Sequence, residues 1–274
     1  MERFIRSILC VLLIMFITVP QVSAEECIPV VYLNGAQVDD TDVVLVDNIV
    51  QISVQTYLDY SGFSYEYTYT NGVYKFVGKT AAGIPYYVQV KEGTKYAIFN
   101  GRYFYIGTTS EVCDNKVYLP AGMLTKFTNG QYIVDSKDSN IQHITTGIDV
   151  LASGDQYYNE DVVYLLGRVI YSEAGNQCLE GKIAVGNVVM NRYKSASFPN
   201  NILDIVYADN QFDGVRTDNF NATPTESCIV AARIALEGQQ MVPGALYFNT
   251  KGLDSWAHRT KTYLGTIQGH DFYA

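Results

Sequence analysis

Hydrophobic and polar positions follow two different periods along the chain, and the change falls between residues 145 and 160. In residues 28–145 they alternate over short runs, as in "FSYEYTYTNGVYKFV" (63–77) and "YYVQVKEGTKYAIFNGRYFYIG" (86–107). Asn71-Gly72 and Asn100-Gly101 each interrupt an alternating run, and Asn-Gly favours a two-residue hairpin turn because both positions need positive φ. This part of the chain is therefore predicted to consist of β-hairpins.

From Glu160 onward the period is helical. In "EDVVYLLGRVIYSEAG" (160–175), Val162, Leu166, Val169 and Glu173 recur at spacings that place them on one helical face. The pattern predicts further helices over residues 181–195 and 226–238. Gly238 would end the last of these, since glycine favours the left-handed conformation beyond a helix C-terminus.

These two patterns predict the domain organisation. Residues 25–145 form a β-rich N-terminal module, residues 146–160 a polar linker, and residues 161–274 a mainly helical domain. The fold class is therefore predicted to be α+β, with two domains.

The β-rich part contains a faint internal repeat. "VYLNGAQV" (31–38) is similar to "AIFNGRYF" (97–104), and "NIVQISVQTYL" (48–58) is similar to "NKVYLPAGML" (115–124). Each unit predicts a strand, an Asn-Gly turn, a strand and a short helix. This layout resembles the copper amine oxidase N-terminal-like domain of exported Gram-positive proteins. With His143 as its one histidine, the segment has no set of copper ligands, and we interpret it as a spacer or wall-associated module.

The N-terminus predicts export. Arg3 and Arg6 precede the apolar run "ILCVLLIMFITVP", and "VSA" ends at Ala24. A basic start, a short apolar run and a small-x-small site are typical of a secretory signal peptide, here residues 1–24. An uncleaved membrane anchor is the alternative, although the run is short for a span of about 20 residues.

The net charge of the chain limits the kinds of polymer that it can bind. The chain has a net charge of −9, and without residues 1–24 it holds 17 basic against 27 acidic residues. Such a chain is a poor candidate for binding nucleic acid or an anionic membrane by charge neutralisation, and it suits a neutral or cationic polymer.

Cysteine usage predicts disulfides. Four cysteines follow the predicted signal peptide, and an even number in an exported chain suggests paired thiols. Because two lie in each half, we expect the pairs Cys27–Cys113 and Cys178–Cys228; four free thiols are the alternative. No CxxC pair is present, so a zinc ribbon is not expected.

Glu173 raises a question of chemistry, because a core helix seldom ends with an inward carboxylate. Burial raises the pKa of a carboxyl group, and a carboxyl protonated near neutral pH can act as a general acid on a leaving oxygen. The alternatives are an ion pair with Arg192 or Arg168, or a helix end that reaches water.

The surrounding motifs resemble the SleB/CwlJ family of cell wall hydrolases. They run in order from about Leu165 to the C-terminus: "LLGRVIYSEAGNQ", "NQFDGV", "AARIALEG", "GALYFNT" and "GHDFY". The resemblance implies a lysozyme-like catalytic domain that cleaves the peptidoglycan glycan strand, for SleB-type members as a lytic transglycosylase. It further implies Glu173 as acid and base, no cofactor, and a monomer secreted to the cell wall or spore cortex.

The same motifs supply candidate substrate-binding residues. Amide, imidazole and aromatic side chains can bond or stack on sugars, and the candidates are Gln211, Phe212, Tyr247, Asn249, His270 and Tyr273. For each aromatic residue, packing in the core is the alternative. Asn187 and Asn191, one turn apart on the second helix, face either Glu173 or solvent.

Two further functions remain open at this point. Asp209 and Asp213 flank "NQF", and either could be the second carboxylate of a hydrolytic muramidase or glucosaminidase. The other function is a non-catalytic wall-binding protein, against which the intact "SEAG" argues. A metal site at His258 and His270 is not expected, since no HxxE or HxH motif is present. Without GxSxG, neither is a nucleophilic serine.

Overall fold

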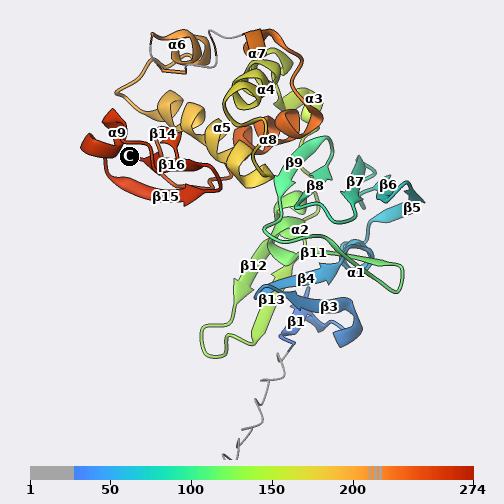
Figure 1. The fold of residues 1–274 in the computed structure, drawn as a ribbon. Coiled ribbons are helices and arrows are strands. Elements are labelled where there is room, and N and C mark those ends of the chain that lie inside the picture. Colours follow the sequence, from blue (N-terminus) through green and yellow to red (C-terminus); the bar gives the residue numbers. More distant parts are fainter. Residues whose placement is uncertain (1–27, 210, 213–214, 216–217) are drawn as a thin grey trace, which may run out of the picture.

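The computed structural model describes residues 28–209, 211–212, 215 and 218–274, and strands dominate its first half and helices its second (Figure 1). The predicted α+β class is confirmed, whereas the division into two domains stays a prediction. The predicted signal peptide, Cys27 and Asp213 lie outside the described residues. Within the described ranges, no helix has the length and apolar character to span a membrane.

Three sheets form the first half. One is antiparallel and in chain order: β5 (Ser64–Thr70), β6 (Val73–Lys79), β7 (Pro85–Lys91), β8 (Tyr96–Phe99) and β9 (Arg102–Tyr105). The second has the order β10 (Glu111–Cys113), β11 (Lys116–Pro120), β4 (Ile49–Ser53) and β3 (Val43–Val46). The third has the order β12 (Gln131–Val134), β13 (Ile141–Thr145), β1 (Val30–Leu33) and β2 (Ala36–Gln37), with β1 and β13 parallel.

The internal repeat is confirmed at the level of local structure. The hairpins β1–β2 and β8–β9 turn on Asn34-Gly35 and Asn100-Gly101, all four with positive φ. In each unit a second hairpin follows, and its last strand leads directly into a helix, α1 (Val54–Tyr60) or α2 (Ala121–Thr128). These two strands, β4 and β11, pair antiparallel, so the two repeats meet in the middle of one sheet.

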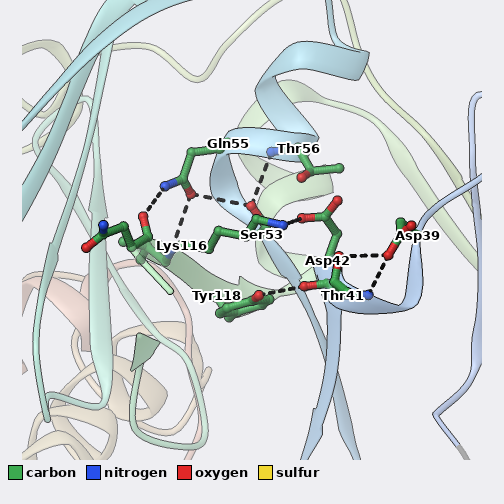
Figure 2. A network of polar contacts seen from close by, with 10 residues as sticks. Asp39, Thr41, Asp42, Ser53, Gln55, Thr56, Lys116 and Tyr118 are labelled. Atoms are coloured by element: carbon green, nitrogen blue, oxygen red, sulfur yellow. Dashed lines mark hydrogen bonds and ion pairs between the residues drawn. The ribbon is translucent and has the colours of Figure 1, made fainter. Parts of the chain in front are cut away.

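A polar network also joins the two repeats (Figure 2). Gln55 in α1 donates to the carbonyl of Asn115 (2.8 Å) and accepts from the N–H of Val117 (3.2 Å) in the other unit. Tyr118 of β11 donates to the carbonyl of Thr41 (2.8 Å), which lies in the 3-10 helix η1 (Asp40–Asp42). These bonds fix the register between units whose sequences are only loosely similar.

Three long helices form the centre of the second half: α4 (Glu160–Ala174), α5 (Leu179–Lys194) and α8 (Glu226–Leu236). All three predicted helices are confirmed, and Gly238 has a φ of +88° just past the end of α8. Gly186 permits the close packing, because a Cβ at this position would lie 3.0 Å from the Cβ of Ala235 on α8. The shorter helices are α3 (Gly154–Tyr157), α6 (Ile202–Tyr207), α7 (Asp218–Asn221) and α9 (Trp256–Thr260).

A three-stranded sheet beside these helices was not foreseen. It has the order β14 (Tyr247–Thr250), β16 (His270–Tyr273) and β15 (Tyr263–Ile267), all antiparallel. Phe272 of β16 is fully buried and packs with Ala184 and Val188 of α5. The sheet thus forms a wall next to the helical core.

The predicted linker and the β8–β9 hairpin lie where the halves meet (Figure 1). Within the linker, Leu151 donates its N–H to the carbonyl of Phe127 (2.9 Å), and Gly154 donates to that of Asn100 (2.6 Å). Three tyrosines of the hairpin, Tyr96, Tyr103 and Tyr105, pack against the hydrophobic cluster of the helices. Each half nonetheless has its own buried cluster.

The disulfide prediction was wrong for the described cysteines. Cys113 and Cys178 are exposed, Cys228 is buried, and all three are free thiols. Cys228 faces into the first turn of α8, where the hydroxyl of Thr225 donates to its sulfur (3.2 Å). An even cysteine count carries no information on the distance and direction that a disulfide requires.

Candidate functional site

A pocket of about 650 Å³ opens at the C-terminal end of α4. Its wall combines one carboxylate with aromatic, amide and cationic side chains from α4, α5, β14, α9 and β16. The lining residues are Glu173, Arg192, Gln211, Tyr247, Phe248, Asn249, Thr250, Leu253, Ser255, Trp256, Ala257 and His270.

Local folding of α4 places Glu173 at this pocket. Asn159 caps the helix, accepting from the N–H groups of Asp161 (3.0 Å) and Val162 (3.3 Å). Leu166 and Val169, on the face predicted to be inward, are fully buried. That face anchors the helix, so that its last turn presents a half-buried Glu173 to the pocket.

The loop after Glu173 is tied to the turn between β15 and β16. Gln177 accepts from the N–H of Gly269 (3.0 Å), and Gln268 accepts from the N–H of Cys178 (2.5 Å). His270 directly follows this turn. These two hydrogen bonds join the loop after α4 to the turn that leads into β16.

Another part of the pocket wall is an aromatic surface on β14 and α9. The amide of Asn249 donates to the carbonyl of Leu253 (3.0 Å) and to the hydroxyl of Ser255 (2.7 Å), which fixes the approach to α9. Trp256, the chain's single tryptophan, is 55% exposed and packs edge-on against Tyr247, with 5.6 Å between ring centroids. An exposed ring held in this way can stack on the apolar face of a sugar.

The structure brings together five of the seven residues singled out from the sequence. Glu173, Gln211, Tyr247, Asn249 and His270 line the same pocket, and their contact with substrate stays a prediction. The other two do not lie in its wall, because both are buried in the packing behind it. Phe212 lies against Phe248 and Arg192, and Tyr273 lies between Tyr247 and Tyr263.

Sequence reasoning missed Arg192 and Trp256 as pocket residues. Arg192 was considered only as an ion-pair partner of Glu173, although an arginine among the apolar residues of "GNVVMNRYK" was a signal. The uniqueness of Trp256 in the chain was a second, weaker signal.

Neither Asn187 nor Asn191 lines the pocket with Glu173, and Asn187 does not face solvent. Asn187 is 1% exposed, donates to the carbonyl of Gln239 (2.6 Å) and accepts from the N–H of Met241 (2.9 Å). Asn191 donates to the carbonyl of Ala245 (3.0 Å). Both asparagines therefore hold the segment that leads from α8 into β14.

Burial sets the charges of the pocket wall. It lowers the pKa of His270 below its ordinary value, against a smaller opposing effect of Asp271, so His270 is neutral at neutral pH. Burial also lowers the pKa of Arg192, to about 10, which leaves the guanidinium charged. Of the described residues in the pocket wall, Glu173 is the only carboxylate. The described part of the chain holds no group of three His, Cys, Asp or Glu side chains suited to a metal ion.

Comparison with known proteins places this region in a family. Residues 176–273 match a family model described as "Cell Wall Hydrolase", which begins just after Glu173. The spore cortex-lytic enzyme of Halalkalibacterium halodurans is 31% identical over 91 residues, which is 33% of this chain and 28% of that protein. That of Oceanobacillus iheyensis is 28% identical over 118 residues, 43% of each chain. This chain therefore spans less than half the length of these relatives.

Two solved structures are similar to the same region. The catalytic domain of the Bacillus cereus SleB protein is 27% identical with a TM-score of 0.40, over 43% of this chain and 92% of that one. The catalytic domain of the germination-specific lytic transglycosylase SleB from Bacillus anthracis is 26% identical with a TM-score of 0.41, over 45% and 100%. On the family match and the sequence relatives, the C-terminal part of this chain is a cell wall hydrolase domain of the SleB/CwlJ type.

Proposed function

We propose that this chain is an exported enzyme that cleaves the glycan strand of peptidoglycan, with Glu173 as its catalytic acid and base. One observation carries the proposal: a carboxylate at the end of a buried helix lines a pocket whose other walls hold an exposed tryptophan and two side-chain amides. Amides bond sugar hydroxyls and acetamido groups, and the tryptophan offers a stacking face. The names of the relatives, spore cortex-lytic enzymes, add the polymer on which such a site would act.

The mechanism that fits a single carboxyl group is that of a lytic transglycosylase. Protonated Glu173 gives its proton to the oxygen between C1 of N-acetylmuramic acid and the next N-acetylglucosamine, and the C1–O bond breaks. The carboxylate then takes the proton from the C6 hydroxyl of the same muramic acid, whose oxygen bonds to C1. The product is a 1,6-anhydro ring, and Glu173 is protonated again without a nucleophilic water.

The setting follows from this chemistry and from the sequence. The signal peptide would deliver the enzyme as a monomer to the cell wall or spore cortex. Germination would be its time of action, since the Bacillus anthracis relative is a germination-specific enzyme. The β-rich N-terminal module would serve as a spacer or wall-associated unit. Peptidoglycan glycan strands are the proposed partner, and no cofactor takes part.

Mass spectrometry of the products tests the proposal. The protein is incubated with purified peptidoglycan, and the soluble muropeptides are compared with those from the Glu173→Gln variant. Anhydro-muramic ends that depend on Glu173 are expected. Reducing ends would indicate a hydrolase with a second carboxylate. No soluble products from the wild-type protein would indicate a non-catalytic wall-binding protein.

A further inference from the structure

Three residues of the pocket wall carry buried, unpaired polar atoms. Among the residues that the structure describes, Arg192 Nη1, Asn249 Oδ1 and His270 Nδ1 are buried and have no hydrogen-bond partner, and all three residues line this pocket. Buried polar atoms are nearly always paired, since an unpaired one loses its hydration without compensation. Unpaired atoms that share one pocket therefore indicate a ligand that supplies their partners.

Of these three residues, Arg192 is held most firmly by its surroundings. Its side chain is 3% exposed, and its Nε donates to the carbonyl of Leu246 (2.8 Å), which fixes one edge of the guanidinium. The rings of Phe212, Phe198 and Tyr247 surround the guanidinium, with 4.8, 5.1 and 5.5 Å from its central carbon to the ring centroids. This aromatic frame holds the plane of the group while Nη1 lacks a protein acceptor.

The unpaired atoms determine which hydrogen-bonding groups a ligand must offer. A guanidinium only donates hydrogen bonds, so Arg192 requires an acceptor, and its bond is strongest with a carbonyl or carboxylate oxygen. The Nδ2 of Asn249 is already used by Leu253 and Ser255, which leaves Oδ1 as an acceptor for an N–H or O–H group. An amide offers both a carbonyl oxygen and an N–H.

We propose that Arg192 is a substrate-positioning residue that donates from Nη1 to the acyl oxygen of an amide substituent on the sugar, with Asn249 Oδ1 accepting from an N–H of the substrate. The proposal rests on the glycan substrate proposed above. Two amides of N-acetylmuramic acid have this chemistry: the acetamido group at C2, and the lactyl group at C3 where it joins the stem peptide.

Binding to three substrates distinguishes these two sources without requiring cleavage. The Glu173→Gln protein is titrated with soluble glycan strands, and the fluorescence of Trp256 is followed as the reporter in the pocket wall. The strands are intact, N-deacetylated, or treated with an amidase that leaves the lactyl carboxylate. Because a charge-assisted hydrogen bond is lost, we expect the Kd to rise about 10- to 100-fold on N-deacetylated strands if the acetamido group is bound. On amidase-treated strands the lactyl carboxylate still accepts from Arg192 but offers no N–H to Asn249, so a change in Kd of that size in either direction would assign the lactyl amide.

Substitution of the arginine completes the test. Arg192→Lys in the same background keeps the charge but cannot reach the same acceptor from the aromatic frame, so it should bind all three strands with similar Kd. Arg233→Lys is the matched control. Arg233 also lies beside two tyrosine rings and has a buried, unpaired Nε, but it is on α8 and does not line the pocket. The Arg233→Lys protein should show the same differences in Kd among the three strands as the parent Glu173→Gln protein.

Two results would overturn the proposal. One is a parent protein that binds the three strands with the same Kd, a result that does not depend on the folding of any arginine variant. The other is an Arg192→Lys protein that discriminates as strongly as its parent. The parent protein could bind the three strands with clearly different Kd values while the wild-type enzyme cleaves none of them. That result would support the Arg192 subsite and contradict only the proposed reaction.

Discussion

Arg102 of β9 and Glu237, the residue that ends α8, form a two-point ion pair between the strand-rich and helix-rich halves. Nε lies 2.9 Å from Oε1 and Nη2 lies 2.6 Å from Oε2, and the Glu237 side chain is 2% exposed. The hydroxyl of Tyr158 also donates to Glu237 (2.7 Å), and the Arg102 guanidinium lies 3.6 Å from the ring centroid of Tyr157. The negative charge of Glu237 at the end of α8 is therefore neutralised by Arg102 from the strand-rich half of the chain.

Removal of Arg102 should destabilise the folded protein by about 3 kcal/mol, because Arg102→Ala leaves the buried carboxylate of Glu237 without its cation. Urea unfolding followed by circular dichroism gives the change in free energy. Arg259→Ala is the control, since its ion pair with Asp254 is exposed and should contribute less than about 1 kcal/mol. Equal effects of the two substitutions would show that the contact between the halves adds little.

Local signals explain which parts of the fold could be predicted. An Asn-Gly turn or a helical face is encoded within a few residues, and the β8–β9 hairpin and α4 formed where the pattern indicated. The sheet β14–β16–β15 depends instead on pairing Tyr247–Thr250 with His270–Tyr273, strands far apart in sequence. Nothing in either short strand specifies that partner.

The candidate site divides in the same way. The motifs pointed to Glu173, Gln211, Tyr247, Asn249 and His270, which line one pocket. The motifs do not distinguish a residue that lines the pocket from one that is buried behind it. Phe212 and Tyr273 were therefore named as candidate substrate-binding residues, although both are buried. The burial of Arg192 was equally hidden, since its aromatic frame comes from three separate segments.

Acid should destabilise the protein partly through His270. Burial lowers the pKa of this imidazole in the folded state below the ordinary value of 6.5, and the neighbouring Asp271 offsets only part of the effect. As the pH falls below about 6.5, the unfolded chain takes up a proton that folded His270 resists, so the free energy of unfolding decreases toward the folded-state pKa.

Urea unfolding at pH 7.0 and at pH 5.5 measures this contribution. His270→Asn should lose less stability between the two values than the wild type does. His258→Asn, a substitution of an exposed histidine, should retain the wild-type dependence. A His270→Asn protein with the full wild-type dependence would assign the acid sensitivity to other groups.

The loop after Glu173 should be sensitive to Gln177. Gln177→Ala removes the acceptor for the N–H of Gly269, one of the two hydrogen bonds that hold the loop after α4 to the turn before β16. We expect kcat on glycan strands to fall about 10- to 100-fold with a smaller change in KM, because displacement of a catalytic group by about 1 Å can cost that much. Gln156→Ala, in exposed α3, is the control. A rise in KM alone would indicate that Gln177 serves binding and leaves Glu173 in position.

Glu173→Gln should lower glycan cleavage by about 10²–10⁴-fold, since the amide keeps the shape of the side chain but cannot transfer the proton. The variant should still bind glycan strands, and its binding should change the fluorescence of Trp256, which lines the same pocket. Glu160→Gln is the matched control: it lies in the first turn of the same helix, far from the pocket wall, and its own side chain is 62% exposed. Cleavage by Glu173→Gln within about tenfold of the wild type, with the control unaffected, would remove Glu173 from the reaction. Loss of both cleavage and binding in a folded variant would instead make Glu173 a binding residue, because a missing proton donor does not weaken the ground-state complex.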